Sequence, residues 1–158
     1  ARLMIERRVV ILGALSSGLL TGCTTSSLLD LSIGAGESEI VTGETLASVN
    51  RLRVEAGLSR LSADRNLGRQ AQAHAEYMAR KDHMSHDNFK KRMRKWKVDL
   101  PAAENVSEGQ RDVAGMFEAF ATSPKHRENM LVGKFRKIGV AVARNKEGRA
   151  FWVMGLSG

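Results

Sequence analysis

Apolar residues recur at helical spacing through the middle of the chain. The clearest set lies over 67–78, on one face of a helix that Ser62 or Asp64 can cap. The stretches 44–56 and 113–120 carry the same spacing, so we expect a helix in each of them. Each predicted helix has one apolar face, and we expect that face to be buried.

The last part of the chain has a different period. The runs 138–143 and 150–154 are short, apolar and rich in residues that favour strands, and the polar residues 145–148 separate them. This arrangement predicts a β-hairpin. Because helices come first and strands last, the order favours a layered α+β domain over a repeat of βαβ units.

The start of the chain differs from the rest. An apolar run over 9–20 follows the basic residues Arg2, Arg7 and Arg8. The run is too short to span a bilayer as a mature helix, but it has the length and the positive flank of a signal-peptide core. It ends in Leu-Thr-Gly-Cys at 20–23, which resembles the bacterial lipobox, where a peptidase cuts before a cysteine that carries acyl chains.

Cys23 is the only cysteine, and we predict that it is lipidated after residues 1–22 leave as a signal peptide. The alternative is an uncleaved anchor or a plain signal peptide with an incidental cysteine. The Ser-, Thr- and Gly-containing stretch 23–43 then predicts a flexible tether, with the folded domain over 44–158. Together these features predict an exported protein, anchored by lipid to a membrane of the bacterial cell envelope and facing the periplasm or the cell surface.

The composition suits one globular domain with an appendage. The chain has 158 residues, is 42% hydrophobic and 27% charged, and carries a formal net charge of +8. A single cysteine allows no internal disulfide, so packing must stabilise the fold. The positive charge favours anionic lipid or polymer surfaces, but without a compact basic motif we expect no nucleic-acid partner.

Residues 89–97 carry the most concentrated charge, with six basic residues around Phe89, Met93 and Trp96. One hypothesis is a segment that lies on an anionic membrane or polymer. The other, which we favour, is a solvated surface helix whose three apolar residues are attached to the core.

Three short signatures contain the residues with the most chemical potential: His86, Glu104 and His126. Ser123 and Pro124 favour the start of a helix, with serine as the cap and proline at the first helical position. His126 would then lie near the helix N-terminus, where the dipole favours a neutral imidazole. A neutral imidazole is the form that binds a metal or takes up a proton.

The other two histidines are weaker candidates. His74 lies on the apolar face of the helix over 67–78, so we expect a hydrogen-bonded core histidine there. His83 lies three residues before His86, a spacing seen in metal sites, but residues 82–85 are typical of a helix exit. We therefore favour an exposed histidine at position 83.

The motifs, taken in order, resemble the CAP (SCP/PR-1-like) family over about residues 44–157, and most closely its bacterial branch. Any one motif is weak, whereas their order and spacing across a whole domain are specific. They are Val49-Asn50, Arg53, Gly57-Leu58, Leu67, Ala71, Ser85-His86-Asp87, Ala103-Glu104-Asn105-Val106, Ser123 to Leu131, Phe135 and Ile138-Gly139-Val140.

The resemblance implies an α-β-α sandwich, with a small antiparallel sheet between helices, and a secreted protein. Many members have a cleft with two histidines and two glutamates, and in some the histidines bind zinc or another divalent ion. His86, Glu104 and His126 match three of these positions, which makes the two histidines candidate metal ligands. The second acid would follow Phe120 by three residues, and Ser123 stands there instead.

Three hypotheses for the function follow. The first is binding of a lipid, an envelope polymer or a protein in the cleft without turnover, with or without a divalent metal. The second is a metal-assisted hydrolase or peptidase that acts on envelope material, with Glu104 as the candidate catalytic base. The third is a structural His/Glu network. The sequence offers no clear nucleophile, and the family is mostly associated with binding, signalling or defence, so we favour the first.

Overall fold

The computed structural model describes residues 34–158. The predicted signal peptide, Cys23 and the first part of the predicted tether lie outside the described residues. The elements are β1 (Ser38–Ile40), α1 (Thr42–Glu55), β2 (Ser62–Ala63), α2 (Arg65–Lys81), α3 (Phe89–Lys95), β3 (Ala102–Glu108), α4 (Val113–Thr122), α5 (Pro124–Met130), β4 (Lys137–Arg144) and β5 (Ala150–Ser157).

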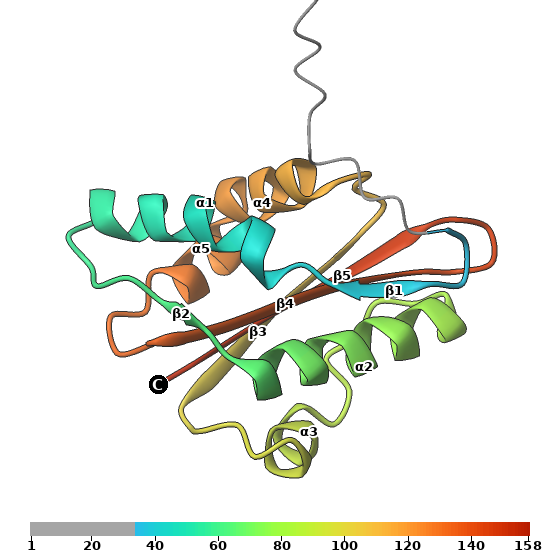
Figure 1. Ribbon diagram of the computed structural model, residues 1–158, viewed down its shortest axis with the longest axis horizontal. Helices are drawn as coiled ribbons and strands as arrows, with labels where there is room; N and C mark the ends of the chain where they lie inside the picture. Colours follow the sequence, from blue (N-terminus) through green and yellow to red (C-terminus); the bar gives the residue numbers. More distant parts are fainter. Residues whose placement is uncertain (1–33) are drawn as a thin grey trace, which may run out of the picture.

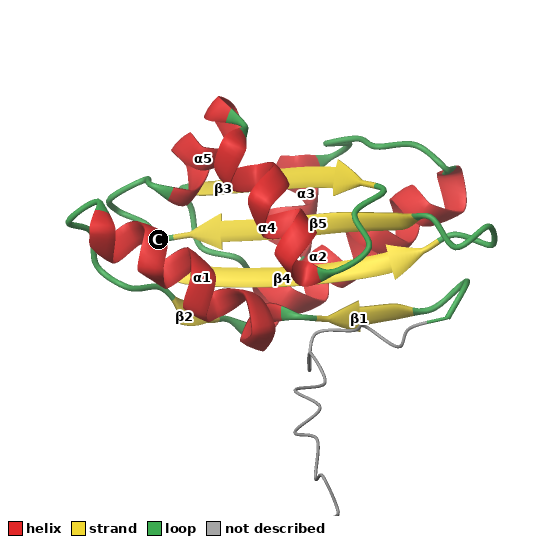
Figure 2. Ribbon diagram, turned by 90° about the horizontal axis from the view of Figure 1, so that it is seen from above, coloured by secondary structure: helices red, strands yellow, loops and turns green. Residues whose placement is uncertain are grey.

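A single sheet forms the middle of the domain, with β4 and β5 at its centre (Figure 2). Its strand order is β1-β4-β5-β3, all antiparallel, and the short β2 pairs with β4 in parallel. The β4–β5 pairing extends from Lys137 opposite Ser157 to Arg144 opposite Ala150. The predicted hairpin is therefore confirmed, and it is longer than the apolar runs alone indicated.

Helices cover both faces of the sheet, in three layers (Figure 1). α1, α4 and α5 lie on one face, and α2 and α3 on the other. Each face has its own hydrophobic core: Trp152, Met154 and Phe120 belong to the first, and Phe151 and Val153 to the second. Alternate β5 residues thus serve opposite layers, as the period of a strand requires. The α-β-α sandwich implied by the resemblance is confirmed.

α2 packs directly on β4. Its N-terminus is capped by Asp64, whose Oδ1 accepts a hydrogen bond from the Leu67 N–H at 2.8 Å. A Cβ on Gly139 of β4 would collide with the backbone of Leu67 and Gly68, so only glycine permits this approach. α2 is the longest described helix, and neither it nor any other helix within 34–158 is long and apolar enough to cross a membrane.

The domain begins earlier than the sequence predicted. Residues 38–40, expected in the tether, pair with β4 as an edge strand, and α1 begins at Thr42. A three-residue strand holds by backbone hydrogen bonds and shows no side-chain period, which explains why the pattern missed it. Ser123 precedes α5 as expected, with Pro124 following, but its side chain makes no capping hydrogen bond.

A buried arginine fixes the chain that leads into β4. Arg53 of α1 is 0% exposed, and its guanidinium donates to the carbonyl oxygens of Ser59, Met130, Val132 and Phe135. Burial, followed by the nearby charge of Arg136, lowers the pKa of Arg53. Because four carbonyls share one guanidinium, this side chain ties α1 to the segment between α5 and β4.

Candidate functional site

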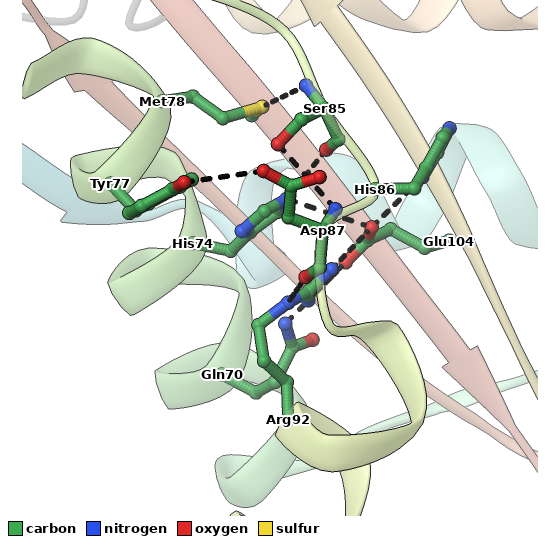
Figure 3. A network of polar contacts seen from close by, with 9 residues as sticks. All are labelled: Gln70, His74, Tyr77, Met78, Ser85, His86, Asp87, Arg92 and Glu104. Carbon is green, nitrogen blue, oxygen red and sulfur yellow. Dashed lines mark hydrogen bonds and ion pairs between the residues drawn. The ribbon is translucent and has the colours of Figure 1, made fainter. Parts of the chain in front are cut away.

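Glu104 is the centre of a buried polar network beside α2. It lies in β3 opposite Gly155 of β5, and its side chain is 1% exposed. Arg92 of α3 donates two hydrogen bonds to it, from Nη1 to Oε2 at 2.6 Å and from Nη2 to Oε1 at 2.9 Å. Gln70 of α2 lies near the same carboxylate, with its Nε2 3.4 Å from Oε2. Figure 3 shows the side chains of Gln70 and Arg92 converging on Glu104 from α2 and α3.

This environment keeps Glu104 ionised. Burial alone would raise the pKa of its carboxyl, but hydrogen bonds from His86 and Arg92, and the charges of Arg92 and His74, outweigh it and lower the pKa to about 2. The bidentate pairing with arginine is the geometry that a planar guanidinium favours. Glu104 is therefore a fixed negative charge at neutral pH.

His86 links this buried charge to the surface. It lies in the loop after α2, and its Nδ1 lies 3.0 Å from Glu104 Oε1. Because the ionised carboxylate only accepts, Nδ1 carries the proton of that hydrogen bond. The side chain is 56% exposed, and Figure 3 shows the second ring nitrogen directed away from Glu104. The hydrogen bond to Glu104 raises the pKa of His86.

His74 of α2 is the buried core histidine that its position predicted, and it supports the network next to Glu104. It is 2% exposed, and its Nε2 lies 2.7 Å from the carbonyl oxygen of Ser85 and 3.8 Å from Glu104 Oε1. The hydrogen bond to Ser85 holds the loop that carries His86. Burial lowers the pKa of His74, although Glu104 opposes the shift. This histidine therefore has a structural part in the site.

His126 lies nearby on α5 without a direct bond to Glu104. Its ring meets Phe120 edge-on at 4.9 Å between centroids. Burial, followed by the charge of His86, lowers the pKa of His126. A lowered pKa favours the neutral form that the sequence predicted. The causes are burial and His86, whereas the sequence prediction rested on the helix dipole. Asn105 donates to the His126 carbonyl oxygen at 2.9 Å and accepts from Asn129, which joins β3 to α5.

The structure thus brings together two of the three predicted residues directly, His86 and Glu104, and places His126 within electrostatic reach of His86. Sequence reasoning missed Arg92. The helical period could have found it, because Arg92 is three residues after Phe89 and four before Trp96, on the face that those residues share with Met93. Arg92 is the only base on that inward stripe.

A resident metal does not fit this donor set. Within residues 34–158, no group of three or more His, Cys, Asp or Glu side chains is placed to hold a metal ion. Zinc sites in proteins take three or four protein ligands. Both oxygens of Glu104 already accept hydrogen bonds, and the charge of Arg92 opposes a second cation. The candidate ligands that remain are the two imidazoles of His86 and His126, and binding of a divalent ion by them stays a prediction.

The family of this chain follows from a comparison with known protein families. The family model described as the cysteine-rich secretory protein family, CAP, matches residues 46–156. The chain belongs to the CAP family. No curated protein sequence matches that of this CAP protein.

Three solved bacterial structures share the CAP fold. An outer surface protein from Borrelia burgdorferi is 20% identical with a TM-score of 0.65, covering 76% of this chain and 97% of its own. An extracellular SCP-domain protein from Bacillus anthracis is 22% identical with a TM-score of 0.65, and a cysteine-rich secretory protein from Staphylococcus aureus is 21% identical with a TM-score of 0.59. These last two matches cover 73% of this chain but 39% of each of those chains, so the chain spans well under half of their length.

Proposed function

We propose that this CAP protein is an exported, lipid-anchored protein of the bacterial envelope that binds a lipid, an envelope polymer or a protein through His86 and His126, without turnover. The predicted signal peptide over 1–22 and the lipobox-like Leu-Thr-Gly-Cys at 20–23 support the anchor. The similar structures belong to proteins described as extracellular, secretory or of the outer surface, which supports export.

The observation that carries the binding role is the contrast between the two ends of His86. One ring nitrogen is fixed by a buried, ionised carboxylate, while more than half of the side chain remains open to solvent. A side chain that is already oriented loses less conformational entropy when it binds. The raised pKa of His86 favours a hydrogen-bond donor there, and the lowered pKa of His126 favours a neutral ring beside it. The pair suits a ligand with neighbouring hydroxyl, carbonyl or acidic oxygens.

The same geometry argues against Glu104 as a general base. An efficient base has a pKa near the working pH, whereas the hydrogen bonds and charges around Glu104 hold its pKa at about 2. Both its oxygens are also engaged by Arg92 and His86. Hydrolysis is therefore the less favoured alternative, and the binding test below includes an assay for it.

The test compares the purified wild type with a His86→Ala/His126→Ala double variant and with His83→Ala. His83 is an exposed histidine three residues from His86, and its side chain makes no hydrogen bond within residues 34–158, so it is the matched control. Each protein is sedimented with purified peptidoglycan and floated with phosphatidylglycerol–phosphatidylcholine vesicles. We expect the double variant to lose about tenfold or more in affinity, while His83→Ala keeps its affinity.

Equal binding by a folded double variant contradicts binding through the histidines, and no binding of either probe by the wild type contradicts a lipid or polymer ligand. A double variant that unfolds by circular dichroism favours the structural network instead. Release of soluble fragments from peptidoglycan, abolished by Glu104→Gln, favours the hydrolase.

The lipid anchor has its own test. The full chain is expressed in a bacterial host, with Cys23→Ser as the comparison. We expect the wild type in the membrane fraction, with an acylated N-terminal peptide by mass spectrometry, and the variant without the acyl mass. An unmodified wild-type peptide that retains residues 1–22 contradicts the anchor.

A further inference from the structure

A concave site lies between α2 and α3, beside the Glu104 network. Its cavity is about 380 Å³, within the range of small-molecule sites. His74 and Arg92 are among its lining residues, and both are held by the network described above. Figure 1 shows α3 as a separate short helix beside α2, on the face of the sheet opposite α1 and α4. The site has fixed walls and an open mouth.

Positive charge dominates the rim. Arg80 of α2 and Lys91 and Lys95 of α3 line the cavity, are exposed, and form no ion pair with any residue of 34–158. Lys91 and Lys95 are one helical turn apart, so they lie on the same side of α3. The two acids of the lining already accept hydrogen bonds, Glu76 from Ser38 Oγ and Asp87 from the Tyr77 hydroxyl. The lining thus carries Arg80, Lys91, Arg92 and Lys95 against these two acids, and the three exposed cations are the groups available to an anionic ligand.

Two aromatic side chains complete the lining, Tyr77 and Trp96. Tyr77 stacks on His74, with 5.9 Å between ring centroids and 12° between planes. Trp96 packs against the small core cluster that contains Leu67 and Met93. Both rings are half-buried and held in place, which suits them to contact the apolar face of a ring-shaped ligand.

We propose that this cavity binds a phosphorylated saccharide, with the phosphate between Arg80, Lys91 and Lys95 and the sugar ring on the aromatic side chains. A phosphate carries up to two negative charges and three acceptor oxygens, which matches three cations that have no ion-pair partner within residues 34–158 better than a single carboxylate does. The sugar ring offers C–H groups to the aromatic faces. This site is separate from the outward nitrogen of His86, so its test does not depend on the function proposed for His86 and His126.

The experiment is an NMR titration of the purified protein with glucose 6-phosphate, inorganic phosphate and glucose. The readout is the indole N–H of Trp96, and that of the buried Trp152, which donates to the Gln110 carbonyl oxygen, is the internal control. We expect saturable movement of the Trp96 signal, with glucose 6-phosphate binding about tenfold or more tightly than either fragment. The Trp152 signal should not move.

The matched variants each remove two charges from α3. Lys91→Ala/Lys95→Ala should weaken glucose 6-phosphate binding about tenfold or more, whereas Lys90→Ala/Arg94→Ala, whose residues lie outside the cavity lining, should change it less than about twofold at physiological salt. The His86→Ala/His126→Ala variant should bind as the wild type does.

The proposal is overturned by any of three results. These are no saturable shift up to about 10 mM ligand, equal weakening by both α3 variants, or equal affinity for phosphate and glucose 6-phosphate. Binding of phosphatidylglycerol vesicles that depends equally on both pairs of charges, without a Trp96 shift by the sugar phosphate, assigns the charges to a membrane surface instead.

Discussion

Replacement of Glu104 by glutamine tests the buried network most sharply. The substitution keeps the shape of the side chain but removes its charge, leaving Arg92 without its anionic partner. A fall in the pKa of Glu104 from 4.5 to about 2 corresponds to about 3 kcal/mol of preference for the ionised form in the folded protein. Loss of one partner from a buried ion pair typically costs about 3–5 kcal/mol. We therefore expect Glu104→Gln to lower the free energy of unfolding at neutral pH by about 3 kcal/mol.

The sign of the pH dependence follows from the direction of the shift. Because the folded-state pKa is depressed, the carboxylate contributes its full stability above the unfolded value of about 4.5, and this contribution disappears as the pH falls toward 2. The gap between wild type and Glu104→Gln should therefore be widest at neutral pH and less than half as large at about pH 3.

Urea denaturation at constant ionic strength measures this gap without the screening that guanidinium salts introduce. Glu108→Gln is the matched control, with the same substitution four residues later in β3. The Glu108 side chain is 34% exposed and its Oε1 lies 4.0 Å from Arg149 Nη1, so we expect a loss below about 1 kcal/mol. A Glu104→Gln protein within about 0.5 kcal/mol of wild type at neutral pH refutes the buried ion pair.

Three further predictions follow from the packing and from the donor set. Gly139→Ala should lower the free energy of unfolding by more than about 3 kcal/mol, because its Cβ would meet the α2 backbone. The control Gly43→Ala, which has open space at its Cβ in α1, should leave stability unchanged or raise it by up to about 1 kcal/mol, and thermal unfolding measures both. Arg53→Met should cost about 3 kcal/mol or more by urea denaturation, since it strips the donors from four carbonyl oxygens, and a loss below about 1 kcal/mol contradicts that role. Elemental analysis should find less than about one tenth of a divalent ion per chain after dialysis against metal-free buffer, and one tightly held ion per chain contradicts our view that the donor set does not fit a resident metal.

The sequence predicted the regular elements well where a side-chain period exists. The helix over 67–78 and the C-terminal hairpin both have such a period, and both are present. β1 and β2 are three and two residues long, and strands this short are defined by their pairing with β4. Only the folded backbone brings those partners together, so no local pattern could predict them.

The candidate site was predictable only in part. The family resemblance implied that His86 and Glu104 lie in one site, and the structure joins them at 3.0 Å. The partner of Glu104 was harder to predict, because six bases crowd residues 90–97 and charge alone does not distinguish them. Helical phase distinguishes Arg92, since it shares the inward face with Met93.

Arg92 bears on the missing second acid of the cleft, where Ser123 stands in this chain. The resemblance implies a cleft with two acids, whereas this chain has one acid, and Arg92 is bound to it. A carboxylate that is paired with a guanidinium has little charge left to attract a cation. The hydrogen bond to this ionised carboxylate raises the pKa of His86, which agrees with the acceptor ligand that we propose for this histidine.

The most direct test of this account is an NMR titration of the four histidine rings in the wild type and in Glu104→Gln. We predict that His86 titrates above the ordinary value of 6.5, that His74 and His126 titrate below it, and that the pKa of His86 falls when Glu104 becomes glutamine. A His86 that titrates at or below 6.5 in the wild type, and does not respond to Glu104→Gln, contradicts the claim that a buried carboxylate holds this histidine ready to bind.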